Sequence, residues 1–176
     1  FLFAMGSIFA LLVVAASCPK AAFSAASSWA VGQKAQVRLV SGGTLQDAEG
    51  LSLPEEARLA YVEIVLEPGW KTYWRSAGDA GGLPPSFDWS KSSNLASAEV
   101  LYPAPRRFTD KAGNTIGYEG ELVLPVALVP ERDDEPILLS LRFEYGICKD
   151  VCIPVESSLS LEISPNETES APASAI

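Results

Sequence analysis

The chain has 176 residues, of which 48% are hydrophobic, and this is enough for one globular domain with short tails. Its formal net charge of −9 argues against nucleic-acid binding, because phosphates would repel it. It contains no histidine, which excludes Ser-His-Asp and Cys-His catalysis and any histidine metal ligand.

The N-terminal segment is almost wholly apolar up to residue 17, and Lys20 is its first charge. We interpret residues 1–26 as a secretory signal peptide that is incomplete at its start, because no basic segment precedes the apolar run. Small residues predict cleavage after Ala26. Alternatively, Ala-Ala-Ser before Cys18 resembles a bacterial lipobox, so a lipid on Cys18 would tether the protein to a membrane. A membrane-spanning helix would need about 20 apolar residues, and this run is short for that.

Residues 27–163 form the predicted folded domain. Alternating or β-branched runs between Gly- and Pro-containing turns predict strands at 29–40, 59–66, 86–89, 98–102, 122–129, 137–145 and 155–163, and an aromatic run lies at 70–75. The segment 106–120 is mostly polar and is expected to be a long connection. Pro125 indicates an edge strand or a bulge. This pattern predicts an all-β, immunoglobulin-like β-sandwich.

The C-terminal residues 164–176 are small, polar and Pro-containing, which is typical of a linker. Because the sequence stops abruptly at Ile176, we expect this linker to be truncated. A membrane segment beyond it would be a second way to tether the protein.

The folded domain has one cysteine pair, Cys148 and Cys152, separated by three residues. In an extended strand their Cα atoms would lie roughly 13 Å apart, whereas a disulfide needs about 4.4–6.8 Å. An oxidised pair therefore requires residues 149–151 to fold back as a tight turn, with Gly146 supplying an unusual backbone angle before it. Closing so small a loop removes little chain entropy, which favours a reversible switch over a stabilising crosslink.

Several motifs occur in a recognisable order across residues 29–163. They are Gly69-Trp-Lys-Thr-Tyr-Trp-Arg75, Gly78-Asp79, Gly81-Gly82-Leu83-Pro84, Tyr118, Leu122-Val-Leu-Pro125-Val126, and the Cys148/Cys152 turn before Ile153-Pro154. Together they resemble the N-terminal periplasmic domain of DsbD-type thiol:disulfide interchange proteins, in particular the DsbD-like and copper-sensitivity-suppressor branch.

The resemblance implies a domain in the periplasm of a Gram-negative bacterium whose cysteine pair cycles between dithiol and disulfide without a bound cofactor. Electrons would come from a thioredoxin-like domain and pass to a periplasmic disulfide isomerase or a thiol carrier of cytochrome c maturation. By the same resemblance, Cys152 forms the mixed disulfide with the partner. Phe108 matches the aromatic tip of a cap loop, and Trp70, Tyr73 and Tyr118 match the residues around the site.

Three functions stay open at this point. The first is a redox-active domain that works as part of a protein-disulfide reductase. The second is a copper-tolerance module that binds Cu(I) with the two thiolates, which suit this soft ion. The third is a structural sandwich with an inert disulfide. Two ligands are too few for a structural tetrahedral zinc site, so no metal site of that kind is expected.

The aromatic residues also allow two interpretations. Trp70, Tyr73 and Trp74 cannot all face one side of a strand, so some of them are expected in the core and the rest over the cysteines. Phe108 lies among polar residues. It is therefore either pinned to the core or used as a lid.

Overall fold

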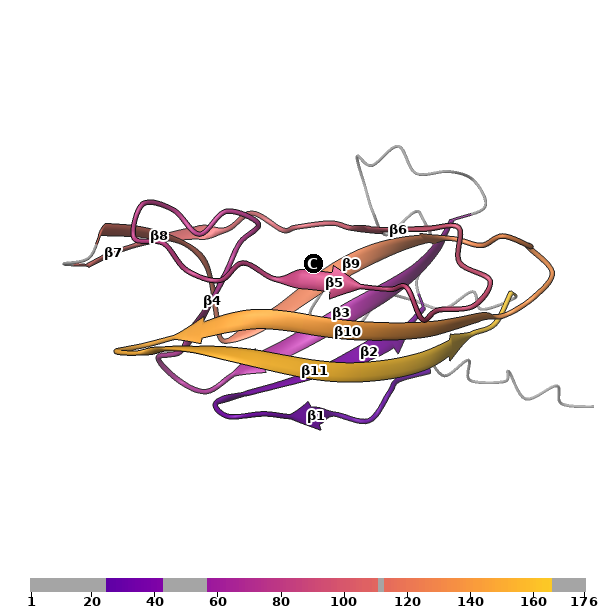
Figure 1. The fold of residues 1–176 in the computed structure, drawn as a ribbon, viewed down its shortest axis with the longest axis horizontal. Coiled ribbons are helices and arrows are strands. Elements are labelled where there is room, and N and C mark those ends of the chain that lie inside the picture. Colours follow the sequence, from indigo (N-terminus) through magenta and orange to yellow (C-terminus); the bar gives the residue numbers. More distant parts are fainter. Residues whose placement is uncertain (1–24, 43–56, 111–112, 166–176) are drawn as a thin grey trace, which may run out of the picture.

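The computed structural model describes residues 25–42, 57–110 and 113–165, and within these ranges it contains eleven β-strands and no helix (Figure 1). Most of the predicted signal peptide and of the predicted linker lies outside the described residues. Ala26, at the predicted cleavage point, forms a β-bridge with Val40. Within the described ranges, no helix is long and apolar enough to cross a membrane.

The strands form two antiparallel sheets. The first contains, in spatial order, β1 (Ala30–Val31), β2 (Ala35–Ser41), β3 (Arg58–Leu66), β9 (Glu121–Val129) and β6 (Ser97–Val100). The second contains β11 (Cys152–Ile163), β10 (Ile137–Cys148), β4 (Lys71–Tyr73), β8 (Gly113–Glu119) and β7 (Arg106–Asp110). β11 covers one edge of β10, while β4 and β5 (Ser86–Asp88) share the other edge.

The core lies between the two sheets, and the alternation of apolar residues explains why these segments fold as strands. Along β10, Leu139, Leu141 and Phe143 are buried, whereas Leu138 and Arg142 face solvent. Such period-two alternation places one face of a strand on the core. The two sheets confirm the predicted all-β, immunoglobulin-like sandwich.

One predicted connection is wrong, because residues 106–120 contain a β-hairpin. β7 pairs with β8 from Arg106 opposite Gly117 to Asp110 opposite Gly113. The hairpin was missed because it lies at the end of the sandwich, where polar residues on both faces hide the alternation that marks a half-buried strand. Figure 1 shows this hairpin at the same end of the molecule as the turn between β10 and β11.

Pro125 does not lie in an edge strand, because β9 is flanked by β3 and β6. Pairing with β6 ends at Val126, one residue from Pro125. Because Pro125 lies beyond the end of this pairing, its missing N–H removes no hydrogen bond between β9 and β6. Its carbonyl oxygen still accepts a hydrogen bond from Leu101 N at 2.8 Å.

Candidate functional site

The two cysteines close the tip of the β10–β11 hairpin. Cys148 and Cys152 lie opposite each other in register, with their Cα atoms 4.2 Å apart, and their sulfur atoms form a disulfide. Residues 149–151 make the predicted tight turn, in which Lys149 N donates a hydrogen bond to Val151 O at 3.1 Å. Cys148 is half-buried, whereas Cys152 is exposed. As a residue, Cys152 is therefore more accessible to a partner protein than Cys148.

The sheet register places the disulfide on the outer face of the second sheet. Cys148 is opposite Lys71, and Lys71 is opposite Glu119. Side chains of residues paired in this way point to the same face of a sheet. The neighbouring pair, Ile147 and Thr72, is buried and faces the core.

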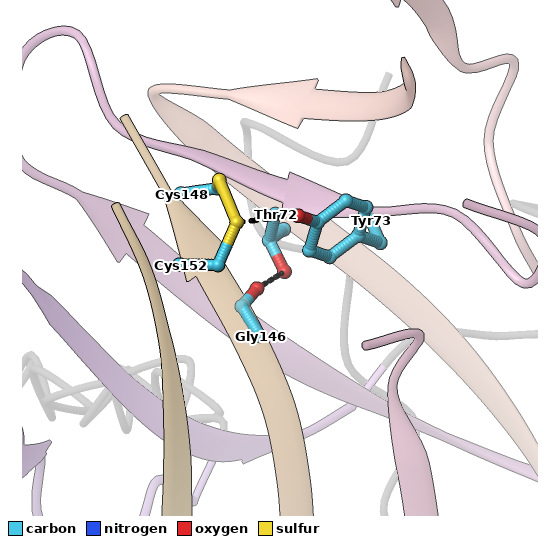
Figure 2. Close-up of a disulfide and its surroundings, with 5 residues drawn as sticks. All are labelled: Thr72, Tyr73, Gly146, Cys148 and Cys152. Carbon is cyan, nitrogen blue, oxygen red and sulfur yellow. Dashed lines mark hydrogen bonds between the residues drawn. A yellow bond between two sulfur atoms is a disulfide. The ribbon is translucent and has the colours of Figure 1, made fainter. Parts of the chain in front are cut away.

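Tyr73 is the sequence-predicted aromatic residue that touches the disulfide. Its hydroxyl group lies 3.1 Å from Cys152 Sγ (Figure 2). A disulfide sulfur carries no proton, so the tyrosine O–H is the donor in this oxidised state. Although Tyr73 lies on the outer face, only 3% of its surface is exposed. It is therefore held in a fixed position and can present its hydroxyl group to the sulfur.

Two glycines make the slot that holds the Tyr73 ring. A Cβ atom on Gly82 would lie 2.2 Å from the ring, and one on Gly146 would lie 3.0 Å from it. Gly146 N also donates a hydrogen bond to Leu83 O at 3.0 Å, which fastens the Gly-rich segment along β10. The motif Gly81-Gly82-Leu83-Pro84 thus acts as a clamp on Tyr73.

Gly146 has a different role from the one predicted. It lies inside β10 and its φ is not positive, so it provides space and not an unusual backbone angle. Its carbonyl oxygen accepts a hydrogen bond from Thr72 Oγ1 at 2.8 Å (Figure 2). This buried bond ties β4 to β10 directly beneath the disulfide.

Phe108 lies in β7 and is half-buried. Arg106, two residues before it, is in register with Gly117, which is in register with Tyr73. Phe108 therefore shares the outer face with Tyr73, although β4 and β8 separate β7 from β10. The Lys71 ammonium lies 5.1 Å from the Phe108 ring centroid, close enough for a cation–π interaction. The side chain of Lys71 thus links Phe108 on β7 to β4, at the position opposite Cys148.

Trp70 and Tyr118 belong to the hydrophobic core cluster and support the sheet from within. The neighbouring Lys71 points to the outer face, and alternation along the strand turns Trp70 inward. Tyr118 donates a hydrogen bond from its hydroxyl group to Pro103 O at 2.8 Å. Burial, with a smaller contribution from Tyr102, raises the pKa of Tyr118 to about 12, so it stays a neutral donor at physiological pH. The structure therefore brings Tyr73, and not these two residues, to the sulfur atoms.

Among the residues that the structure describes, no three His, Cys, Asp or Glu side chains are grouped so that they could hold a metal ion. Binding of Cu(I) by only two thiolates, Cys148 and Cys152, stays a prediction. A titration of the reduced domain that shows no tight 1:1 binding would remove this alternative.

We expect Phe108→Ala to speed alkylation of the reduced cysteine pair by iodoacetamide. Loss of the ring would uncover part of the outer face next to Lys71. Leu138→Ala provides a matched control, because Leu138 is a 50% exposed apolar residue at the far end of β10. The alkylation rate can be followed by mass spectrometry. A rate that is the same in wild type, Phe108→Ala and the control would show that Phe108 is not a lid.

The fold and the site define an immunoglobulin-like domain that carries a disulfide at the tip of its last strand hairpin. The family described as thiol:disulfide interchange protein DsbD, N-terminal, matches residues 43–163. The chain belongs to this family, which confirms the resemblance seen in the sequence.

Two solved structures of similar domains match the chain. The N-terminal periplasmic domain of ScsB from Proteus mirabilis is 28% identical, with a TM-score of 0.60, over 86% of this chain and 55% of that one. The chain therefore spans little more than half of that domain's length. The reduced N-terminal domain of DsbD from Neisseria meningitidis is 17% identical, with a TM-score of 0.35, over 69% of this chain and 95% of that one. No curated protein matches the chain.

Proposed function

We propose that this chain is a periplasmic thiol–disulfide exchange domain, which passes reducing equivalents through Cys148 and Cys152. The observation that carries the proposal is the accessible hairpin disulfide, with Cys152 exposed and hydrogen-bonded by Tyr73. Membership in the DsbD N-terminal family supports it, and the similar domain of ScsB is described as periplasmic.

The greater exposure of Cys152 as a residue supports the following order of steps. A donor thiolate attacks Cys152 Sγ, the Cys148–Cys152 bond breaks, and Cys148 leaves as a thiolate that takes up a proton. The second donor thiolate then attacks the donor's own sulfur in the mixed disulfide and releases Cys152. The donor becomes a disulfide, and the domain gains two electrons and two protons.

Neighbouring residues bear on the release of each sulfur atom as a thiolate. Tyr73 can donate its hydrogen bond to the Cys152 thiolate when that sulfur is released, as it does to the disulfide. Lys71 lies opposite Cys148, and Lys149 follows it in the chain. Cations close to a cysteine favour the thiolate over the thiol. Lys71 and Lys149 would therefore favour the release of Cys148 as a thiolate, whereas Asp150 in the same turn would oppose it.

The partners follow from the family. We propose a thioredoxin-like domain as electron donor, and a periplasmic disulfide isomerase or a thiol carrier of cytochrome c maturation as acceptor. The domain would then be one component of a protein-disulfide reductase. A membrane tether, through Cys18 or a segment beyond Ile176, stays a prediction on residues outside the described ranges.

The test is the reaction of the native oxidised domain with reduced thioredoxin, followed by mass spectrometry of alkylated cysteines. We expect the Cys148–Cys152 disulfide to be reduced while the domain remains folded. The same protein in guanidinium chloride provides the control for complete accessibility. A disulfide that thioredoxin reduces only after unfolding would leave the domain as a scaffold with an inert crosslink.

A further inference from the structure

Several positively charged side chains lie at the disulfide end of the second sheet, although the chain as a whole is acidic. Three of them, Lys71 on β4, Arg106 on β7 and Lys149 in the cysteine turn, form what we call the cationic rim. Each comes from a different element. The rim therefore arises from the fold and not from a run of basic residues in the sequence.

Lys71 and Lys149 flank Cys148. Lys71 faces Cys148 across the β4–β10 pairing. The side chain of Lys149 folds back over the turn before β4, where a Cβ atom on Gly69 would lie 3.1 Å from its Nζ atom. Lys71 thus lies on the outer face at this end of the hairpin, and the Lys149 ammonium lies beside the turn before β4 at the same end.

Arg106 extends the rim across the hairpin of β7 and β8. Its guanidinium group forms an ion pair with Glu119 at 2.6 Å and lies 5.9 Å from the Phe108 ring centroid. Glu119 is opposite Lys71 in register, and Asp150 is exposed in the cysteine turn. Phe108, between Lys71 and Arg106, adds a half-buried apolar ring to this surface.

The connection between β9 and β10, at the opposite end of the molecule, is acidic, and Arg58 donates hydrogen bonds to its backbone. The connection between β9 and β10 contains Glu131, Asp133, Asp134 and Glu135, with Arg132 as its only cation. It immediately precedes Ile137, which pairs with Ile163 at the end of the hairpin away from the cysteines. At about 3.3 Å per residue, this end lies roughly 36 Å from the disulfide.

We propose that the cationic rim is the docking surface for a redox partner that carries carboxylates around its own cysteines. The proposal rests on the proposed function and adds the charge of the partner to it. The field of this domain would attract an acidic partner to the disulfide end and repel it from the far end. Charge complementarity of this kind orients an encounter and raises its rate more than it raises affinity. Exposed Val151, in the cysteine turn, and Phe108 would supply the apolar contacts.

The test uses two thiol peptides of equal length, in which a central cysteine is flanked by glutamates or by lysines. For each peptide, the second-order rate constant for reduction of the Cys148–Cys152 disulfide is measured and expressed per concentration of peptide thiolate. At low salt we expect the acidic peptide to react faster by about tenfold. At about 1 M salt, where charges are screened within about 3 Å, the two rates should converge.

Charge-reversal variants show which residues cause the difference in rate between the two peptides. Lys71→Glu and Arg106→Glu should each lower the ratio of acidic to basic rates, and this ratio cancels any change in the intrinsic reactivity of the disulfide. Arg132→Glu provides the control, because it changes the net charge equally at the far end of the molecule.

The outcomes separate the two proposals. Equal rates for both peptides, or an equal effect of Arg132→Glu, would overturn the docking surface and leave exchange intact. A native disulfide that neither peptide nor dithiothreitol reduces would overturn the proposed function, and the docking surface with it.

Discussion

Cys148→Ser is expected to accumulate a mixed disulfide with a thioredoxin-like partner, whereas Cys152→Ser is expected to form almost none. Cys152 is the exposed residue of the pair and receives the hydrogen bond from Tyr73, so we propose that its sulfur forms the mixed disulfide. Without Cys148, no second thiol remains in the hairpin to resolve the complex. Each variant is incubated with a thioredoxin variant that retains only its attacking cysteine, which is supplied as an activated mixed disulfide. The complex is then quantified by mass spectrometry without reductant.

The variant that lacks both hairpin cysteines sets the background for this experiment. Circular dichroism should show that all variants keep the sheet structure, since so small a loop contributes little to stability when it is closed. If Cys152→Ser accumulated the complex and Cys148→Ser did not, Cys148 would be the attacking sulfur, and the order of steps proposed above would be reversed.

Gly117→Ala is expected to destabilise the domain by about 3 kcal/mol, the upper end of the usual cost of overpacking. A Cβ atom at this position would lie 2.0 Å from the backbone oxygen of Thr72 and 3.1 Å from Tyr73 Cα. Backbone atoms in a paired strand cannot move aside as a flexible side chain can. β4 and β8 would have to separate, and β4 carries both Lys71 and Tyr73.

The measurement for this prediction is urea unfolding followed by circular dichroism or by tryptophan fluorescence. Gly32→Ala is the matched control, because the nearest atom to its new methyl group would be the tip of the Val155 side chain at 3.3 Å. We expect the control to cost less than about 1 kcal/mol. Equal stability of Gly117→Ala and wild type would show that β4 and β8 are not packed as closely as described.

The sandwich was predictable from sequence where one face of a strand is buried. Phe143 and its neighbours alternate along β10 because the core covers one face and water the other. The hairpin of β7 and β8 was not predictable in this way, since its position at the end of the sandwich leaves no clear apolar face. The position of Pro125 depends on where β6 stops, and the composition of β9 does not contain that information.

The spacing of Cys148 and Cys152 predicted that a disulfide between them needs a tight turn, and the structure contains both. The environment of the pair could not, because it depends on register. Lys71 faces Cys148 only because β4 pairs with β10 at that position. Gly82 and Gly146 appeared as turn or flexibility signals, and only the three-dimensional structure shows that they make room for Tyr73. A loop glycine and a strand glycine that meet one tyrosine ring leave no local pattern in the sequence.

The reduction potential of the Cys148–Cys152 pair tests the central claim most directly. It can be measured by equilibrating the native domain in defined thiol–disulfide buffers and quantifying the oxidised fraction by mass spectrometry. A domain that exchanges electrons during its work is expected to have a potential above about −300 mV. A potential below that value, typical of structural disulfides, would contradict the account.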